Sequence, residues 1–177
     1  CDSAAHEGAL DAGAPTVAVL PTPLDAPVYP KENQSLAERI LESGGALISE
    51  YAPGMQLNGR QLAGNLVARD EWQPVLADGI VAFETAVDGG TRHALEHAKD
   101  AGIPIGVFDY RSRGEVDFTN DPRFGGNVDY LIDKGASPIY GPDTIQLFKR
   151  RMEEHRSRVS YYVVQEQDDV KQQMLPL

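Results

Sequence analysis

A short turn in the middle of the chain has the composition of an anion-binding site. Gly89, Gly90 and Thr91 follow an apolar run that ends at Glu84-Thr85, and they precede a run with helical spacing. Glycine lacks a Cβ, so the backbone can approach an anion closely, and the free N–H groups at the positive end of the following helix can bind it. The Thr91 hydroxyl can join the site or cap the helix instead. We predict a phosphate-binding turn here, with a plain helix cap as the alternative.

Three arginines could add positive charge to such a site. A guanidinium makes bidentate contacts with phosphate, which makes Arg69 a candidate ligand, although it could equally form an ion pair with Asp70 or Glu84. Arg92 lies in the first turn of the helix after Thr91, so it could reach a ligand or remain on the surface. Arg60 lies in a Gly-rich stretch and is either a nucleic-acid contact or a solvated side chain.

Two other side chains suit a nucleoside. Trp72 could stack on a base, although its helical spacing from Leu76 also fits a core or interface position. Glu50 ends an apolar run and could accept a hydrogen bond from a ribose hydroxyl, or it could interact with the end of a neighbouring helix.

The chain offers little for metal binding or covalent catalysis. His93 and His97 have the four-residue spacing of metal ligands on a helix, but no cysteine lies nearby and no third ligand has a matching spacing. Cys1 stands at the end of the chain, and there is no Gly-x-Ser-x-Gly motif. We therefore predict no metal ligand, no catalytic residue and no cofactor.

The elements that must position these residues alternate between strands and helices. The spacing predicts strands at 15–20, 46–50, 79–85, 103–109 and 137–140, and helices at 35–45, 66–76, 90–101, 127–136 and 142–158. Continuous apolar strands in this alternation are typical of a parallel sheet buried on both faces. We predict an α/β, Rossmann-like fold with a mostly parallel sheet and helices on both faces. Ligands of such sheets bind at the carboxyl ends of the strands.

The segments between and beyond these elements lead to several expectations. Residues 51–65 are rich in Gly, Pro and Asn and predict a loop, and residues 111–126 predict an ordered loop over the carboxyl edge of the sheet. Asn127 follows two glycines and is expected to be a helix N-cap. The basic stretch 149–158 is either a solvated helix or a nucleic-acid contact, and residues 161–164 are either an added strand or part of a docking tail.

Composition limits the class of protein. The chain has 177 residues, 41% of them hydrophobic, which is enough for one globular domain with tails. A net charge of −11 argues against a nonspecific nucleic-acid coat but leaves room for a small basic cleft. The single cysteine excludes an internal disulfide, which favours the cytoplasm, and no apolar run is long enough to suggest a membrane partner.

Several motifs occur together in one order. From the start of the chain they are Asp2, His6, Leu24-Asp25, Tyr29-Pro30, Asn33, Ser49-Glu50 and Pro53-Gly54. Arg69 and the segments 89–108 and 125–139 continue the series. In this order they resemble the Rossmann-like domain of the DNA-processing protein A (DprA/Smf) family, over residues 2–145. On this basis we expect a DprA-like domain at 1–145 and a charged helix and tail at 146–177.

The resemblance implies a function. Proteins of this family bind single-stranded DNA in a basic pocket, form dimers and help to load the RecA recombinase, and they are not known for a catalytic reaction. It therefore implies a non-catalytic, homodimeric protein that binds single-stranded DNA or a nucleotide phosphate, with RecA as a partner. The superfamily also contains LOG-type enzymes, so a nucleotide phosphoribohydrolase is an alternative, as is a nucleotide-sensing domain.

The chain also departs from the family pattern. The first strand, its Gly-Ser-Arg turn and a Ser-Gly loop would precede Cys1, so we expect a further segment upstream. The Arg-Asn-Arg signature is replaced by Arg69-Asp70-Glu71, and two carboxylates near a phosphate should weaken its binding. A charged helix and tail stand where the family has a winged-helix-like module.

Overall fold

The structure is a computed structural model that describes residues 2–112, 118 and 120–173. The chain forms two compact units, Cys1–Gln73 and Pro74–Leu177, and each is described by itself. The predicted division near residue 145 stays a prediction. Across the described residues, no helix has both the length and the apolar character needed to cross a membrane.

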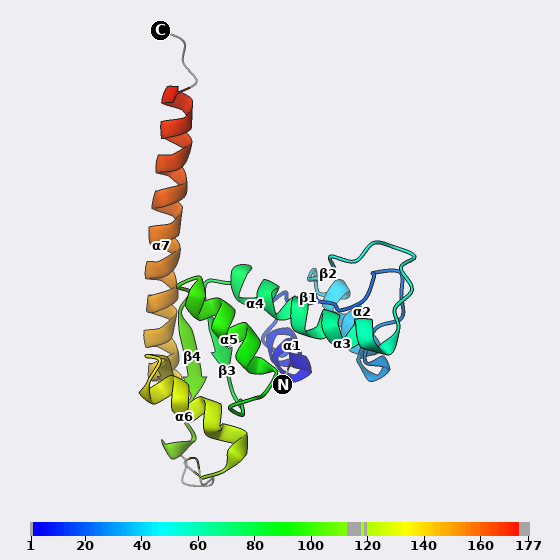
Figure 1. The fold of residues 1–177 in the computed structure, drawn as a ribbon, viewed down its shortest axis with the longest axis horizontal. Coiled ribbons are helices and arrows are strands. Elements are labelled where there is room, and N and C mark those ends of the chain that lie inside the picture. Colours follow the sequence, from blue (N-terminus) through cyan, green and yellow to red (C-terminus); the bar gives the residue numbers. More distant parts are fainter. Residues whose placement is uncertain (1, 113–117, 119, 174–177) are drawn as a thin grey trace. The chain divides into compact units, whose positions relative to one another are not determined.

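The first unit contains a two-stranded parallel sheet and its helices (Figure 1). Its elements are α1 (Asp2–Asp11), β1 (Val17–Val19), a 3-10 turn (Lys31–Asn33), α2 (Gln34–Glu42), β2 (Ala46–Ile48), α3 (Gly59–Ala68) and a second 3-10 turn (Arg69–Glu71). The strands pair in register from Val17 and Ala46 onward. α2 buries Leu36, Ala37 and Ile40, which recur at the spacing of one helical face. The short helix α4 (Trp72–Val75) begins where this unit ends.

The second unit contains a three-stranded parallel sheet with the order β3-β4-β5. Its elements are β3 (Ile80–Ala82), α5 (Thr91–Asp100), β4 (Ile105–Phe108), 3-10 turns at Tyr110–Ser112 and Pro122–Phe124, α6 (Gly125–Ile132), β5 (Ser137–Ile139) and α7 (Pro142–Gln173). Because all three strands are parallel, their carboxyl ends meet at one edge, and the turn that leads to α5 starts there.

Helices cover both faces of this second sheet. On one face, Leu95 and Ala98 of α5 and Tyr130 of α6 pack with Ala82 and Val107 in a buried cluster. On the other face, α7 packs closely against glycines of the strand region. A Cβ at Gly106 would lie 3.3 Å from the Phe148 ring, and a Cβ at Gly79 would lie 2.8 Å from the Met152 side chain. These glycines let the helix approach the sheet.

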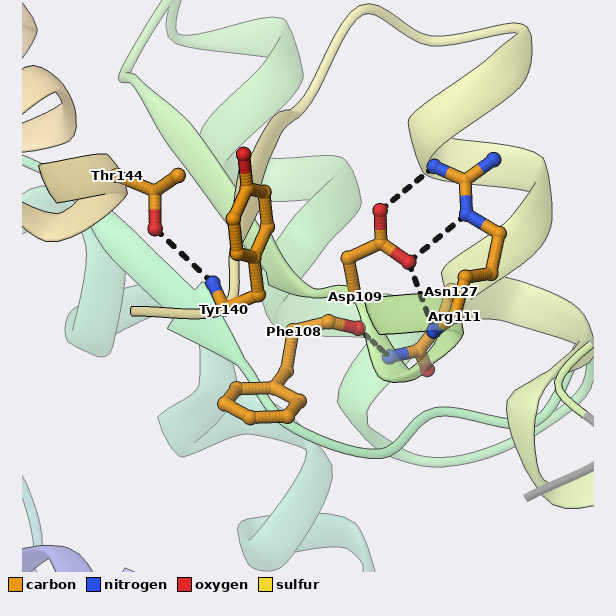
Figure 2. Close-up of polar contacts among 6 residues, drawn as sticks. All are labelled: Phe108, Asp109, Arg111, Asn127, Tyr140 and Thr144. Carbon is orange, nitrogen blue, oxygen red and sulfur yellow. Dashed lines mark hydrogen bonds and ion pairs between the residues drawn. The ribbon is translucent and has the colours of Figure 1, made fainter. Parts of the chain in front are cut away.

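The start of α7 is tied to the end of β5 by one hydroxyl. Thr144 is buried, and its Oγ1 accepts a hydrogen bond from the Tyr140 amide at 3.0 Å (Figure 2). It also accepts from the Gly141 amide at 3.1 Å. The same hydroxyl donates to the carbonyl oxygen of Gly141 at 2.8 Å. The turn between β5 and α7 is therefore a defined connection.

The α/β class and the parallel pairing of the strands are confirmed, with the strands divided between two sheets. The predicted loop at 51–65 was wrong from residue 59 onward, because α3 begins at Gly59. A capping box starts this helix: Asn58 Oδ1 accepts from the Gln61 amide at 2.9 Å, and Gln61 Oε1 accepts from the Asn58 amide at 3.0 Å. Arg60 thus lies in a helix and not in a Gly-rich loop.

Two other expectations were also wrong. Asn127 is not an N-cap, since α6 already begins at Gly125. Of the two alternatives for residues 161–164, the added strand is wrong, because α7 runs through them, and the docking tail stays a prediction. The predicted loop at 111–126 lies partly outside the described residues and contains a 3-10 turn at Pro122–Phe124. Cys1 also lies outside the described residues.

Candidate functional site

The turn before α5 has two main-chain amides with no acceptor among the described residues. The Gly89 amide donates to the carbonyl of Ala86 at 3.1 Å, which closes the turn. The carbonyls of Gly89 and Gly90 accept from the amides of Arg92 (3.1 Å) and His93 (3.0 Å). Within the described part of the chain, no hydrogen bond uses the amides of Gly90 and Thr91. The positive end of a ten-residue helix thus has two donors available for an anion.

The surroundings of the turn fit this role. A Cβ placed on Gly90 would meet no heavy atom within 4 Å, so the space on that side of the residue is open. Gly90 precedes the helix with helical dihedral angles (φ −57°, ψ −40°), and no side chain caps α5. The alternative in which the Thr91 hydroxyl caps the helix is therefore wrong. Both Gly90 and Thr91 are exposed.

Asn127 joins the carboxyl ends of β3 and β4, and it also contacts Thr85 at the start of this turn. Its side chain is completely buried, and its Oδ1 accepts from the Thr85 amide at 2.8 Å. Its Nδ2 donates to the carbonyls of Phe83 (2.8 Å) and Phe108 (3.1 Å); Figure 2 shows the contact with Phe108. Sequence reasoning missed this role. The available signal was the position of Asn127 three residues before Tyr130, on the face of α6 that becomes buried.

The glycines before Asn127 allow α6 to lie against the turn. A Cβ on Gly126 would lie 2.8 Å from the Thr85 carbonyl oxygen, and one on Gly125 would lie 2.8 Å from Val87 Cγ2. The Gly126 amide donates to the Thr85 carbonyl at 2.9 Å. Any larger residue at these positions would push α6 away and disturb the start of the turn.

A carboxylate and a guanidinium form a compact pair at the end of β4. Asp109 is buried, and its carboxylate accepts from Arg111 Nε at 2.8 Å and from Arg111 Nη2 at 2.7 Å (Figure 2). The Arg111 amide also donates to Asp109 Oδ1 at 3.1 Å. The Arg111 side-chain hydrogen bonds are the main cause that lowers the pKa of Asp109 below its ordinary value, against the effect of burial. Asp109 is therefore ionised at neutral pH.

A row of aromatic rings lies along the same edge. Phe83 stacks on Phe108 with 5.2 Å between centroids, Phe108 contacts Tyr110 at 4.7 Å, and Tyr110 contacts Phe124 at 4.5 Å. The Arg123 guanidinium lies 5.3 Å from the centroid of the Phe124 ring. Sequence reasoning did not single out these residues, because aromatic side chains at strand ends look like ordinary core positions.

Arg92 bends back over the turn that it follows. Its Nη1 donates to the Val87 carbonyl at 3.3 Å, and its Nε lies 3.6 Å from Glu96 Oε1 one helical turn later. These contacts stabilise the turn and the helix, although a surface ion pair of this kind contributes only about 0.5 kcal/mol.

Arg69 lies in the first unit, at the carboxyl end of β1. Its Nη1 donates to the Val19 carbonyl at 3.3 Å, and its Nη2 donates to Asp2 Oδ2 at 3.0 Å. Its Nε is 4.0 Å from Asp70, so the predicted ion pair with Asp70 is confirmed and Asp2 is an additional partner. Arg69 and Thr91 belong to different units, and their cooperation in one site stays a prediction.

The structure brings together the two residues that were predicted separately to bind a base and a ribose. Trp72 Nε1 donates to Glu50 Oε2 at 3.1 Å, while the Trp72 residue remains 40% exposed. Burial and, second, a hydrogen bond to Glu50 raise the pKa of Tyr51 to about 12. An exposed indole beside a carboxylate could present a flat surface to a base and an acceptor to a sugar hydroxyl.

The remaining candidates lie on the surface. Arg60 is exposed in the first turn of α3. His93 and His97 are exposed on α5, and the described residues contain no group of three or more His, Cys, Asp or Glu side chains arranged to hold a metal ion.

Comparison with known proteins relates this geometry to a family. The DNA processing protein DprA of Streptococcus pneumoniae is 34% identical over 154 residues, which cover 84% of this chain and 48% of that protein. Protein Smf of Escherichia coli is 33% identical over 149 residues, covering 81% of this chain and 35% of Smf. The chain therefore spans half or less of the length of these relatives.

Solved structures agree with the sequence comparison. The X-ray structure of DprA from Streptococcus pneumoniae matches with a TM-score of 0.65 and 27% identity, over 82% of this chain and 47% of that one. A structure of DprA from Helicobacter pylori, which describes the single-stranded DNA binding mode of that protein, matches with a TM-score of 0.59 over 86% of this chain and 72% of that one. At 16% identity, this second match shows a common fold alone.

The family model for DNA recombination-mediator protein A matches residues 1–149. This range includes the turn before α5, the Asn127 bridge and the residues around Arg69. The chain belongs to the DNA recombination-mediator protein A family.

Proposed function

We propose that this chain is a DNA-processing protein that binds single-stranded DNA or the phosphate of a nucleotide. The observation that carries the proposal is the pair of amides at Gly90 and Thr91, which no described residue accepts from, at the positive end of α5 and at the carboxyl edge of a parallel sheet. Main-chain donors at a helix N-terminus bind phosphate without a cationic side chain. Binding through the backbone is important here, because a chain with a net charge of −11 repels phosphate overall.

The framework around the turn supports the proposal. Asn127 holds Thr85, where the turn begins, and Gly126 allows α6 to pack against the same residue. Donors that are held in place before a ligand arrives lose little conformational freedom on binding. The turn is therefore suited to hold a phosphate through the backbone alone.

The first unit, taken by itself, also offers groups that suit a nucleotide or a strand. Trp72 would stack on a base, Glu50 would accept from a sugar hydroxyl, and Arg69 would bind a phosphate after exchanging Asp2 for it. Asp2 is exposed for 60% of its side chain, so this exchange needs no rearrangement of the core. Arg60, exposed on α3, is a further candidate contact with nucleic acid.

The relatives extend the proposal to partners. DprA of Helicobacter pylori binds single-stranded DNA, and the relatives from Streptococcus pneumoniae and Mycobacterium tuberculosis are DNA processing proteins by name. On the resemblance we also propose a homodimer that acts with RecA in the cytoplasm. These partners rest on the family alone.

The proposal is tested with the 177-residue chain and a fluorescently labelled dT oligomer at low salt. Thr91 is the first residue of α5, where proline is well tolerated, and Gly90 before it lacks a Cβ, which removes one of the two clashes that a helical residue has with a following proline. Thr91→Pro removes one proposed donor and should weaken binding about ten- to hundredfold, since a hydrogen bond to a charged group contributes about 1.5–3 kcal/mol. Thr91→Ala keeps the amide and is the matched control. Equal affinities of the proline and alanine variants, both folded by circular dichroism, would contradict the proposal.

The part that Arg69 plays is tested by releasing it from its partner. Asp2→Asn removes the carboxylate that occupies Arg69 Nη2, so DNA affinity should rise by roughly two- to fivefold if this guanidinium binds phosphate. Arg69→Ala should lower it. An Asp2→Asn variant that binds more weakly than the unmodified chain would remove Arg69 from the site.

A further inference from the structure

We propose that Phe83 is the residue on which an unpaired nucleobase stacks next to the α5 turn. This inference rests on the proposed function and names a contact that the phosphate-binding turn does not provide. Phe83 directly follows β3, two residues before Thr85, and 49% of the residue is exposed. An aromatic side chain with half its surface open, at the edge where the sheet binds ligands, has a free face for another ring.

The Phe83 ring is held in position without a ligand. It stacks on Phe108 with 5.2 Å between centroids and an angle of 22° between the ring planes. The backbone on both sides of Glu84 is fixed, because Asn127 donates to the Phe83 carbonyl at 2.8 Å and accepts from the Thr85 amide at 2.8 Å. A ring that a neighbouring ring already orients loses less entropy when a base packs against it.

Phe83 is the exposed end of the row of aromatic rings, and the rings become more buried from Phe83 toward Phe124. Phe108 and Tyr110 are half-buried, and Phe124, which Tyr110 contacts at 4.5 Å, is only 3% exposed. The row therefore has a support on its inner side and an accessible ring at Phe83. An incoming base would extend the stack by one ring.

The charges at this edge favour stacking over ionic attraction. Among the described residues at this edge, three arginines already pair with a carboxylate: Arg92 with Glu96, Arg111 with Asp109, and Arg123 with Asp121. Paired guanidiniums attract a polyanion weakly, so contacts with the bases must supply a larger share of the affinity. Every base has a π face, so we expect the site to accept all four bases. A strand without bases should bind more weakly.

The experiment compares two labelled oligomers of equal length and charge. One is oligo-dT, and the other has abasic tetrahydrofuran units in place of the nucleosides, so it keeps the phosphates and loses the rings. The unmodified chain should bind oligo-dT at least tenfold more tightly than the abasic oligomer. Phe83→Ala should remove most of that difference and leave the abasic affinity unchanged. Phe83→Tyr should retain the difference, because it keeps the aromatic face.

Val81 provides a matched control, since it is an apolar residue of β3, two positions before Phe83, and is 39% exposed. Val81→Ala should keep the difference between the two oligomers. A Phe83→Ala variant that weakens both oligomers equally, or neither, would overturn the stacking role and leave the phosphate site standing, and so would equal binding of the two oligomers by the unmodified chain. Failure of both oligomers to bind the unmodified chain would overturn the proposed function and this inference with it.

Competition with dTMP shows whether the base that stacks on Phe83 can come from a free nucleotide or only from a strand. If dTMP displaces oligo-dT from the unmodified chain, and Phe83→Ala raises the dTMP concentration needed, the site takes a free nucleotide as well as a strand. If dTMP does not compete while the oligomer difference holds, the base is that of a polymer. Both results support the stacking role.

Discussion

The buried amide of Asn127 joins groups that are far apart in the sequence. It contacts main-chain atoms of Thr85, Phe83 and Phe108, which precede it by 42, 44 and 19 positions. A carboxamide is suited to this place because it donates and accepts at once without carrying a charge. The residue thereby holds the carboxyl ends of two parallel strands at the distance that the turn requires.

Asn127→Asp should therefore destabilise the protein although it changes the shape very little. The carboxylate would keep the acceptor for Thr85 but would face the carbonyls of Phe83 and Phe108 without a proton to donate. Burying unsatisfied or charged groups in this way costs about 2–5 kcal/mol. Chemical denaturation of the variant measures the loss, with the exposed Gln56→Ala as a control that should stay within about 0.5 kcal/mol. An equal effect of the two substitutions would show that the bridge does not stabilise the fold.

The pair of Asp109 and Arg111 should contribute stability that depends on pH. The pKa of Asp109 is lowered in the folded state, so its contribution is fully present above the unfolded carboxyl pKa of about 3.9 and is lost as the pH falls through the lower folded value. Melting temperatures measured from pH 7 down to about pH 3 should fall more for the unmodified chain than for Asp109→Asn. Other acidic groups are common to both proteins and cancel in the difference. Parallel curves would mean that Asp109 has the same pKa in the folded and unfolded chains.

At the scale of elements, α7 is part of the second unit and covers one face of its sheet. Phe148 is 3% exposed and lies against Gly106, while its neighbour Leu147 is 58% exposed. The helix has a packed side and an open side along residues 142–152. The charged helix predicted from the sequence thus has a structural function in its first turns.

Phe148→Ala should cost about 3–5 kcal/mol of unfolding free energy, because it removes a buried ring and leaves a cavity against the sheet. Leu147→Ala deletes a side chain of similar hydrophobicity from the open side and should cost less than about 0.5 kcal/mol. Urea denaturation of both variants gives the comparison. Similar losses would indicate that α7 does not depend on this contact.

At the scale of the whole molecule, the charge of −11 limits how the chain can bind DNA. Nucleic-acid affinity falls with salt in proportion to the number of phosphates neutralised, with a slope of about −0.7 per phosphate for single strands. The site proposed here relies on backbone donors, stacking and at most a few guanidiniums. We expect a slope of log K against log salt no steeper than about −2.

Fluorescence anisotropy with oligo-dT at several salt concentrations between about 50 and 200 mM measures this slope. The abasic oligomer serves as a reference, because its binding depends on phosphates alone. A slope steeper than about −4 would require a track of unpaired cations, and it would rule out a site built mainly from amides and rings.

Local patterns in the sequence predicted the order of strands and helices well. The apolar runs at 79–85 and 103–109 contain β3 and β4, and the helix expected from residue 90 begins at Thr91. The start of α3 was missed although its signal is local. The Gly, Pro and Asn content of residues 51–65 suggested a loop, whereas Asn58 and Gln61 have the spacing of a capping box.

The sequence by itself determined the family, the α/β class and the glycine turn, because periodicity and motif order are properties of neighbouring residues. The tertiary structure alone decided that Asn127 joins two strands, that Phe83 ends a supported aromatic row and that Arg69 is held by Asp2, 67 positions away. Contacts between residues so far apart depend on how the loops bring distant segments together. Local sequence patterns do not predict which distant segments meet.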